Sequence, residues 1–168
     1  KIFAVETSRP GSFSLRTLLT LKQLTQKDAQ TFRRAVSLSS RRRDDTTPKL
    51  LTGFYQKPSM FALFSLRKEQ QLNLAMFGLS YPDLLSLMDL GLIHQTEIES
   101  GEWPMDAKFE WRSNGQIFNL TARKNGTTLK YYKFTTTGAE LFTLVGANKQ
   151  EKYLEALKLT LTSAFTID

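Results

Sequence analysis

Seven basic residues are the clearest candidates for chemistry in this 168-residue chain, because Lys and Arg side chains bind phosphate and carboxylate oxygens. Five are arginines within a short stretch, and two are lysines much further along. The candidate nucleic-acid-binding residues are Arg33, Arg34, Arg41, Arg42, Arg43, Lys124 and Lys130. Asp44 and Asp45 follow the arginines directly and can neutralise part of their charge, so a solvated charged loop is the competing interpretation.

The side chains that catalysis usually needs are poorly represented. His94 is the single histidine, there is no cysteine, and no serine stands in a nucleophile-elbow setting. The adjacent carboxylates of Asp44 and Asp45 have no evident third ligand, and the glycines form no phosphate-binding loop. We therefore predict no catalytic residues, no metal site, no cofactor and no enzymatic activity.

The net charge of +7 is unevenly distributed along the chain. Residues 1–58 contain twelve Lys or Arg against four acids, whereas residues 59–168 contain eleven against twelve. A basic first third favours nucleic acid or an acidic protein surface as a partner. The absence of cysteine fits a reducing compartment, and no apolar run is long enough to cross a bilayer. We expect a cytoplasmic protein with no membrane partner.

Helix signals position the arginines of the first third. Ser12 or Ser14 can cap a short helix, and Thr25 with Asp28 resembles the capping box of a second helix. The second helix places the first two arginines near its solvent side. Residues 39–49 contain no apolar side chain, which predicts an exposed basic loop that presents the other three.

The middle of the chain predicts a strand, a helix and a meander. Apolar side chains through residues 60–65 indicate a buried strand. Ser80 and Asp83, with a proline between them, mark the start of an apolar helix that ends at Gly91. Residues 107–134 alternate in polarity and contain two Asn-Gly turn signals, which predict a three-stranded antiparallel meander.

The order of helix, meander and a further helix at Thr135 resembles a winged helix, and a long amphipathic helix then closes the chain. We predict an α+β fold, with a helical region and exposed basic loop over residues 1–52 and a winged-helix-like region over residues 53–168. A winged helix often binds DNA through the helix before the wing. Residues 83–106, however, contain six acids and no Lys or Arg, so phosphate would be repelled there.

Four segments resemble a family of uncharacterised conserved proteins from gammaproteobacteria. They are residues 6–18 with the motif Pro-Gly-Ser-Phe-Ser, residues 21–29, residues 80–93, and the motif Thr-x-x-Gly-x-Glu-Leu that begins at Thr135. That family is distantly similar to the abortive-infection alpha proteins. The resemblance covers most of the chain and corresponds to the C-terminal part of the family, which implies a missing helical N-terminal region. It also implies a cytoplasmic setting and a link to phage defence or mobile elements, and it transfers no catalytic residues.

Two functional hypotheses remain. The leading one is a non-enzymatic cytoplasmic interaction module of a longer bacterial protein, which binds a protein partner or associates with itself. The alternative is a nucleic-acid-binding, winged-helix-like protein that uses the basic loop and basic strands. Salt distinguishes them, because phosphate contacts weaken steeply as salt rises and an apolar interface does not.

Overall fold

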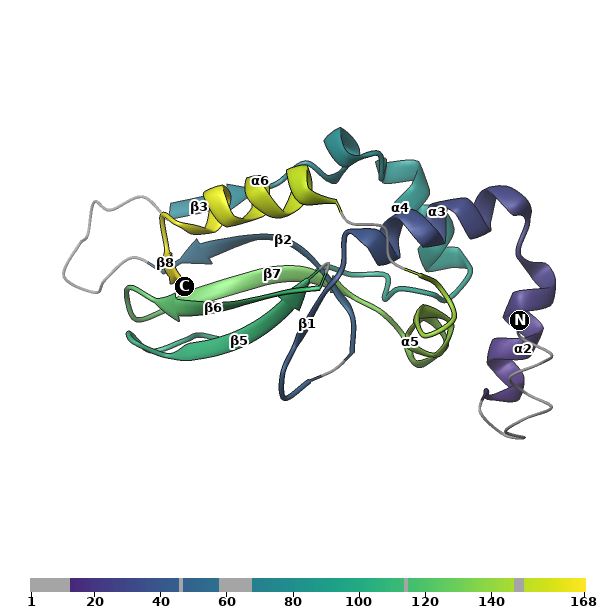
Figure 1. Cartoon of the computed structure of the whole chain (residues 1–168), viewed down its shortest axis with the longest axis horizontal. Helices are drawn as coiled ribbons and strands as arrows, with labels where there is room; N and C mark the ends of the chain where they lie inside the picture. Colours follow the sequence, from purple (N-terminus) through teal and green to yellow (C-terminus); the bar gives the residue numbers. More distant parts are fainter. Residues whose placement is uncertain (1–12, 46, 58–67, 114, 147–149) are drawn as a thin grey trace.

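A computed structural model describes residues 13–45, 47–57, 68–113, 115–146 and 150–168. The described residues form one curved antiparallel sheet with helix α6 along one face, while the other helices gather at one end (Figure 1). The strands are β1 (Ser40–Arg42), β2 (Lys49–Gln56), β3 (Lys68–Gln71), β4 (Ile98–Glu99), β5 (Lys108–Ser113), β6 (Gln116–Ala122), β7 (Thr127–Lys133) and β8 (Phe165–Ile167). The helices are α2 (Leu15–Gln23), α3 (Gln26–Ser37), the 3-10 helix η1 (Leu74–Phe77), α4 (Tyr81–Asp89), α5 (Thr136–Phe142) and α6 (Glu151–Leu161). The predicted α+β class is confirmed.

The helices begin where local capping groups predict. The Ser14 hydroxyl accepts a hydrogen bond from the Thr17 amide at the start of α2. Thr25 and Asp28 form a complete capping box at the start of α3. The hydrogen bonds from Thr25 lower the pKa of Asp28, since they stabilise its ionised form. Each predicted start is confirmed because capping satisfies amides within one helical turn.

Both ends of helix α4 are also set by residues close in sequence. Ser80 and Asp83 cap its N-terminus reciprocally, with proline in the first turn. The hydrogen bonds from Ser80 outweigh partial burial and lower the pKa of Asp83. Gly91 has a φ of 66°, which is the left-handed conformation predicted for the end of this helix.

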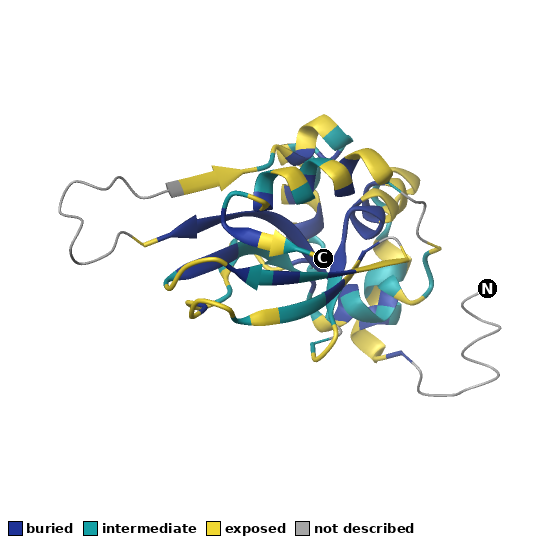
Figure 2. Ribbon diagram, turned by 60° about the vertical axis from the view of Figure 1, so that its left-hand side comes forward, coloured by how far each residue is buried: buried dark blue, intermediate teal, exposed yellow. Residues whose placement is uncertain are grey.

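Strand β2 lies at the centre of the sheet. All eight of its residues are buried, in contrast to the exposed Glu69, Gln70 and Gln71 of its neighbour β3 (Figure 2). It pairs with β7 along one edge, and with β1 and β3 along the other. Helix α6 packs on this part of the sheet, where the Tyr153 hydroxyl donates to the Leu51 carbonyl oxygen at 3.0 Å. Burial raises the pKa of Tyr153, so the phenol remains a neutral donor.

The sheet bends enough for its far end to meet its centre. Its strands run in the order β4, β7, β2, β1, β5, β6 and β8, and β3 pairs separately with β2. Phe165 of β8 packs edge-on against Phe54 of β2, with ring centroids 6.2 Å apart. Trp103 lies against the same Phe165 ring at 5.4 Å. These aromatic contacts close an apolar core inside the bend.

The predicted three-stranded meander is wrong in its third strand. Strands β5 and β6 form the expected hairpin, with Gly115 at a φ of 79°. The chain also turns at Gly126, but β7 leaves β6 and pairs with β2 and β4, while β6 pairs with β8. A turn signal predicts that the chain reverses, and it does not select the partner. The buried strand β2 needs a partner on each edge, and β7 supplies one.

The predicted exposed loop of residues 39–49 is also wrong in part. Ser40 begins strand β1 and pairs with Lys49, and both residues are buried. The predicted boundary between residues 52 and 53 falls within β2, whose sheet contains strands from both sides of that boundary. The strand predicted at residues 60–65 lies outside the described residues.

The turn after α4 packs closely against the start of α5. The Thr-x-x-Gly-x-Glu-Leu motif and the Pro-Gly-Ser-Phe-Ser motif both contribute to this junction. The Thr135 hydroxyl caps α5 and donates to the Gly91 carbonyl oxygen at 2.5 Å. The Ser14 amide donates to Glu140 Oε2 at 2.9 Å, which joins α5 to the start of α2. Although burial opposes ionisation, the hydrogen bonds from Thr17 and Ser14 lower the pKa of Glu140. The Thr-x-x-Gly-x-Glu-Leu motif therefore links three helices.

Gly138 lies very close to the backbone of Leu92 in this junction. We predict that position 138 tolerates no side chain. A Cβ atom at this position would lie 2.0 Å from the backbone oxygen of Leu92. Because both elements are held by backbone hydrogen bonds, Gly138→Ala should lower the free energy of unfolding by about 3 kcal/mol. Urea unfolding followed by circular dichroism measures the change.

The matched control is Gly146→Ala, since a Cβ atom at that glycine meets nothing within 4 Å. We expect it to change stability by no more than about 0.5 kcal/mol. Equal stability of the two variants would contradict the proposed backbone contact.

Candidate functional site

An irregularity in β2 creates the most distinctive site of the described structure. Leu51 pairs with Tyr131 and Gly53 pairs with Lys130, so Thr52 is an extra residue without a partner in the ladder. Such a bulge redirects a side chain, and bulges occur often beside functional sites. The Thr52 side chain consequently lines a cavity of about 350 Å³.

Gly53 makes the bulge compatible with strand β3. A Cβ atom on Gly53 would lie 2.0 Å from the Gln70 carbonyl oxygen. The backbone of β3 can therefore approach the bulge only because position 53 has no side chain. The Leu72 amide then donates to the Thr52 carbonyl oxygen at 2.6 Å, which holds the two strands together.

The polar side chains of Thr52 and Gln71 form the floor of the cavity, and charged side chains lie next to them. The Thr52 hydroxyl donates to Glu97 Oε1 at 2.5 Å, and the Gln71 amide nitrogen donates to the same oxygen at 3.3 Å. Lys130 pairs with Glu69 and lies 3.8 Å from Glu97 Oε2. The Glu97 carboxylate is thus held by β2, β3 and β7 together.

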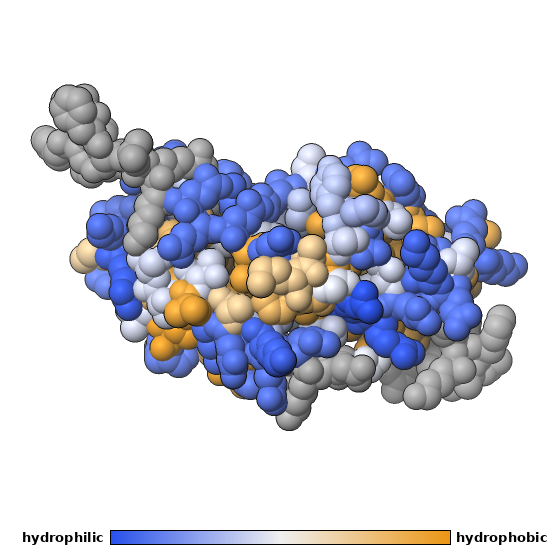
Figure 3. Space-filling model, turned by 90° about the horizontal axis from the view of Figure 1, so that it is seen from above, coloured by the Kyte–Doolittle hydropathy of each residue, from blue (hydrophilic) through white to orange (hydrophobic). Residues whose placement is uncertain are grey.

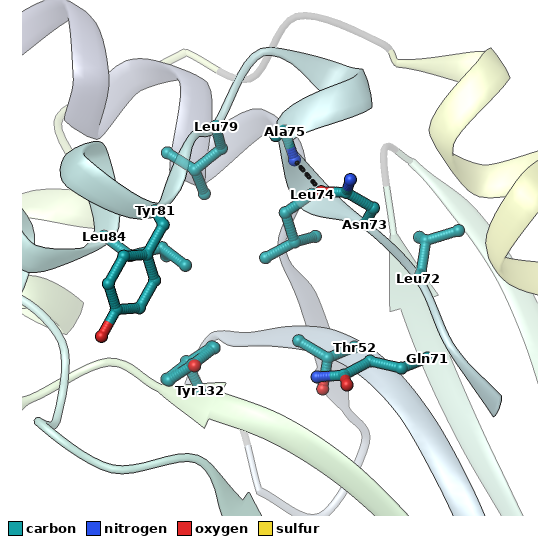
Figure 4. Close-up of a pocket in the computed structure, with 10 residues that line it drawn as sticks. All are labelled: Thr52, Gln71, Leu72, Asn73, Leu74, Ala75, Leu79, Tyr81, Leu84 and Tyr132. Carbon is teal, nitrogen blue, oxygen red and sulfur yellow. Dashed lines mark hydrogen bonds between the residues drawn. The ribbon is translucent and has the colours of Figure 1, made fainter. Parts of the chain in front are cut away.

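Apolar and aromatic side chains form the opposite wall. Leu74, Leu79 and Leu84 are buried, and they come from η1, the following turn and α4. Figure 4 shows these leucines facing Thr52 and Gln71 across the cavity. Tyr81 and Tyr132 lie at one side of it. The cavity volume is about 350 Å³, which is within the range of small ligand sites.

The charged side chains next to this cleft are mainly acidic. Glu69, Glu97 and Glu99 lie around one lysine, Lys130. Glu99 accepts a hydrogen bond from the Tyr55 hydroxyl at 2.7 Å. Burial, reinforced by the nearby Glu97 charge, raises the pKa of Tyr132, which keeps its phenol neutral.

This arrangement is suited to binding. It has hydrogen-bonding groups on one side, backed by the carboxylate of Glu97, and an apolar surface on the other. Within the described ranges, no group of three or more His, Asp or Glu residues is placed to hold a metal ion. We name this site the bulge cleft, defined by Thr52, Gln71, Leu72, Asn73, Leu74, Ala75, Leu79, Tyr81, Leu84 and Tyr132.

None of these cleft residues was among the predicted site residues. A signal was present in the pair Thr52-Gly53, which interrupts an apolar run from Leu50 to Phe54 and is typical of a bulge. The contact with Glu97 could not be found in this way, since Glu97 lies 45 positions from Thr52.

The predicted basic residues lie on several separate elements. Arg33 and Arg34 are exposed on α3, and Arg34 Nη1 donates to the Gly78 carbonyl oxygen at 2.6 Å. Lys124 is exposed in the turn between β6 and β7. Lys130 lies on β7, where it pairs with Glu69 and approaches Glu97 next to the bulge cleft.

Arg41, Arg42 and Arg43 remain neighbours but point in alternate directions along β1 and its end. Arg42 Nε lies 2.7 Å from Asp44, and its guanidinium packs 4.8 Å from the Phe109 ring centroid. Arg43 is largely exposed and pairs with Glu110 at 3.3 Å. The structure therefore brings three of the seven predicted residues together.

A nearly buried ion pair braces the connection between β1 and β2. Lys49 is 4 % exposed, and its Nζ donates to Asp45 Oδ2 at 2.8 Å and to the Thr47 carbonyl oxygen at 3.0 Å. Burial lowers the pKa of Lys49. Burial acts to raise the pKa of Asp45, but hydrogen bonds from Lys49 and Thr47 outweigh it, and the net shift is strongly downward.

Comparison with known proteins identifies one family. The model of a family described as a protein of unknown function (DUF2806) matches residues 1–158. No curated protein and no solved structure matches the chain. In the part of the chain that the structure describes, no helix is both long enough and apolar enough to span a membrane.

We predict that Asp45→Asn destabilises the protein in a pH-dependent way. The change leaves the Lys49 charge without its counter-ion, and should lower the free energy of unfolding at neutral pH by about 2 kcal/mol. Asp45 has a lower pKa in the folded state than in the unfolded state, so its contribution is present above the unfolded value and is lost as pH falls below about 4. The stability difference between wild type and variant should therefore narrow in acid.

Urea unfolding at about pH 7 and about pH 3.5 measures this difference. Asp44→Asn is the matched control, because Asp44 is exposed and its pair with Arg42 should contribute no more than about 1 kcal/mol. A difference that stays constant with pH would contradict the assigned role of Asp45.

Proposed function

The chain belongs to the DUF2806 family, whose description assigns no function, and from the geometry of the bulge cleft we propose that it is a non-enzymatic protein-interaction module. The observation that carries this proposal is the cleft itself. An apolar wall faces a polar floor across about 350 Å³, and a bulge in a buried strand directs Thr52 into it. Sites of this composition bind a few side chains of a partner and fix their orientation by hydrogen bonds.

The proposed occupant is an extended segment of a partner protein that carries an apolar side chain beside a Lys or Arg. Leu74, Leu79 and Leu84 provide the contact surface for the apolar side chain. The acids around Lys130 exceed its single positive charge, so they favour a basic neighbour.

The biological setting is a separate part of the proposal. We place the protein in the bacterial cytoplasm, as part of a longer chain with a role in phage defence. This placement rests on the resemblance of the segments described above, together with the lack of cysteine.

The helices at the end of the sheet support a winged-helix-like interpretation of the helical part, in which the β5–β6 hairpin is a scaffold. Helix α3 packs against α4, and α4 leads through Ile93 to a bridge with Phe134 and then to α5. In this interpretation the exposed side of α4 presents Tyr81 and Leu85 with acids, a surface that suits a protein partner better than DNA.

Nucleic-acid binding is the second proposal, and fewer contacts support it. Arg34, Arg43 and Lys130 already have partners in Gly78, Glu110 and Glu69. The basic residues also lie on several separate elements, whereas backbone binding normally uses a continuous basic groove. What remains in its favour is the clustering of Arg41, Arg42 and Arg43.

We predict that the chain selects peptides from a random displayed library that share an apolar residue next to Lys or Arg. Synthetic copies should bind measurably by fluorescence anisotropy. Ala75→Trp, which fills the cleft, should weaken binding by about tenfold or more, equivalent to about 1.4 kcal/mol.

Met76→Trp is the matched control, because Met76 is 78 % exposed and does not line the cleft. It should bind the same peptides as tightly as the wild type. Enrichment of peptides without the apolar and basic pair, or equal loss in both variants, would overturn the proposal.

We predict only weak binding to labelled duplex DNA and single-stranded RNA. Anisotropy at about 50 mM and about 150 mM salt should show binding that disappears at the higher salt. A variant with Arg41, Arg42 and Arg43 changed to alanine should behave similarly at the higher salt. Submicromolar binding near physiological salt that this variant loses would replace the protein-interaction proposal with the nucleic-acid proposal.

A further inference from the structure

A second site forms where strands β1 and β5 pair, away from the residues of the bulge cleft. Arg41 lies directly opposite Arg112 in the antiparallel register. Arg43 is two positions beyond Arg41, so its side chain projects from the same face. These three arginines, with Arg42 and Glu110, line a cavity of about 140 Å³.

The placement of like charges is the unusual feature of this site. Directly opposed side chains on paired strands lie close together, and like charges there destabilise the pair. Glu110 is the single acid among the lining residues of the cavity, and it already pairs with Arg43. The four lining arginines, with Glu110 and with Asp44 that pairs with Arg42, leave a local charge of about +2.

Contacts with the rest of the fold orient these arginines. The Arg41 guanidinium lies 5.1 Å from the Phe142 ring centroid, and an aromatic face holds a guanidinium while leaving its N–H groups available at the edges. The Arg43 amide donates to the Glu110 carbonyl oxygen at 3.0 Å, which extends the pairing of β1 with β5 beyond Arg42. Arg42 packs over Phe109 and pairs with Asp44, so its charge is already balanced.

We propose that Arg41, Arg43 and Arg112 form a binding site for a phosphate monoester. Guanidinium groups match phosphate oxygens in a forked geometry, and a doubly charged oxyanion offsets the repulsion between Arg41 and Arg112. A phosphomonoester carries a charge of about −1.5 to −2 at neutral pH, close to the local excess of positive charge. The small, concave shape favours a single terminal phosphate over the backbone of a nucleic acid.

The proposal revises the set of basic residues that act together. It adds Arg112, which lies opposite Arg41 in the strand register. It omits Arg42, which pairs with Asp44, and Arg33, Arg34, Lys124 and Lys130, which lie on other elements. It does not depend on the bulge cleft, so a failure of the peptide experiment leaves it unaffected.

Isothermal titration calorimetry of the full chain with methyl phosphate, at about pH 7.5 and constant ionic strength, tests the site. We expect saturable binding, weakened about tenfold or more by Arg112→Gln, since charge-assisted hydrogen bonds are lost. Arg41→Gln provides a second variant with the same expected loss. Arg33→Gln removes an equal charge from exposed α3 and should leave binding unchanged.

Three further measurements distinguish a phosphomonoester site from loss of folding, from a general anion site and from a nucleic-acid site. Circular dichroism without ligand should show each variant folded, and dimethyl phosphate, which carries one charge less, should bind about tenfold more weakly or not at all. Equal weakening by Arg33→Gln, or no saturable heat with the wild type, would overturn the proposal. Tighter binding of an oligonucleotide without a terminal phosphate, sensitive to Arg112→Gln, would also overturn it in favour of a nucleic-acid site.

Discussion

The extra residue in β2 is the constraint on which the rest of the sheet depends. Every residue of β2 is buried, so its backbone must find partners on both edges. The bulge at Thr52 lets one edge follow β7 while the absence of a side chain on Gly53 admits β3 on the other. The same irregularity directs Thr52 toward Glu97 and opens the space beside Leu74. Sheet pairing and cleft formation therefore have one physical cause.

The helices are attached to this sheet by short polar contacts. Thr135 and Gly138 hold α5 against the end of α4, and Glu140 reaches the amide of Ser14. Helix α6, which lies along one face of the sheet, has both buried and exposed apolar side chains. Leu159 is 75 % exposed. The view from above shows this face as mainly hydrophilic with small apolar areas (Figure 3). A broad apolar interface there has less support than a cleft that receives individual side chains.

Sequence reasoning succeeded for contacts within one turn of the chain. The capping groups at Ser14, Thr25 and Ser80 and the left-handed Gly91 could be predicted because each contact joins residues three or four positions apart. It failed for strand partners. The Asn-Gly turn before β7 correctly indicated a reversal, but β7 pairs with a strand from the first third of the chain.

The sequence by itself determined the fold class, the helix starts, the β5–β6 hairpin and the uneven charge, since these follow from local propensity and composition. Only the tertiary structure decided which charges meet. It buried Lys49 against Asp45, set Arg41 opposite Arg112, and joined Lys130 to Glu69. These pairings require a strand register, and register is selected by burial over the whole sheet. A list of basic residues becomes a site only after that selection.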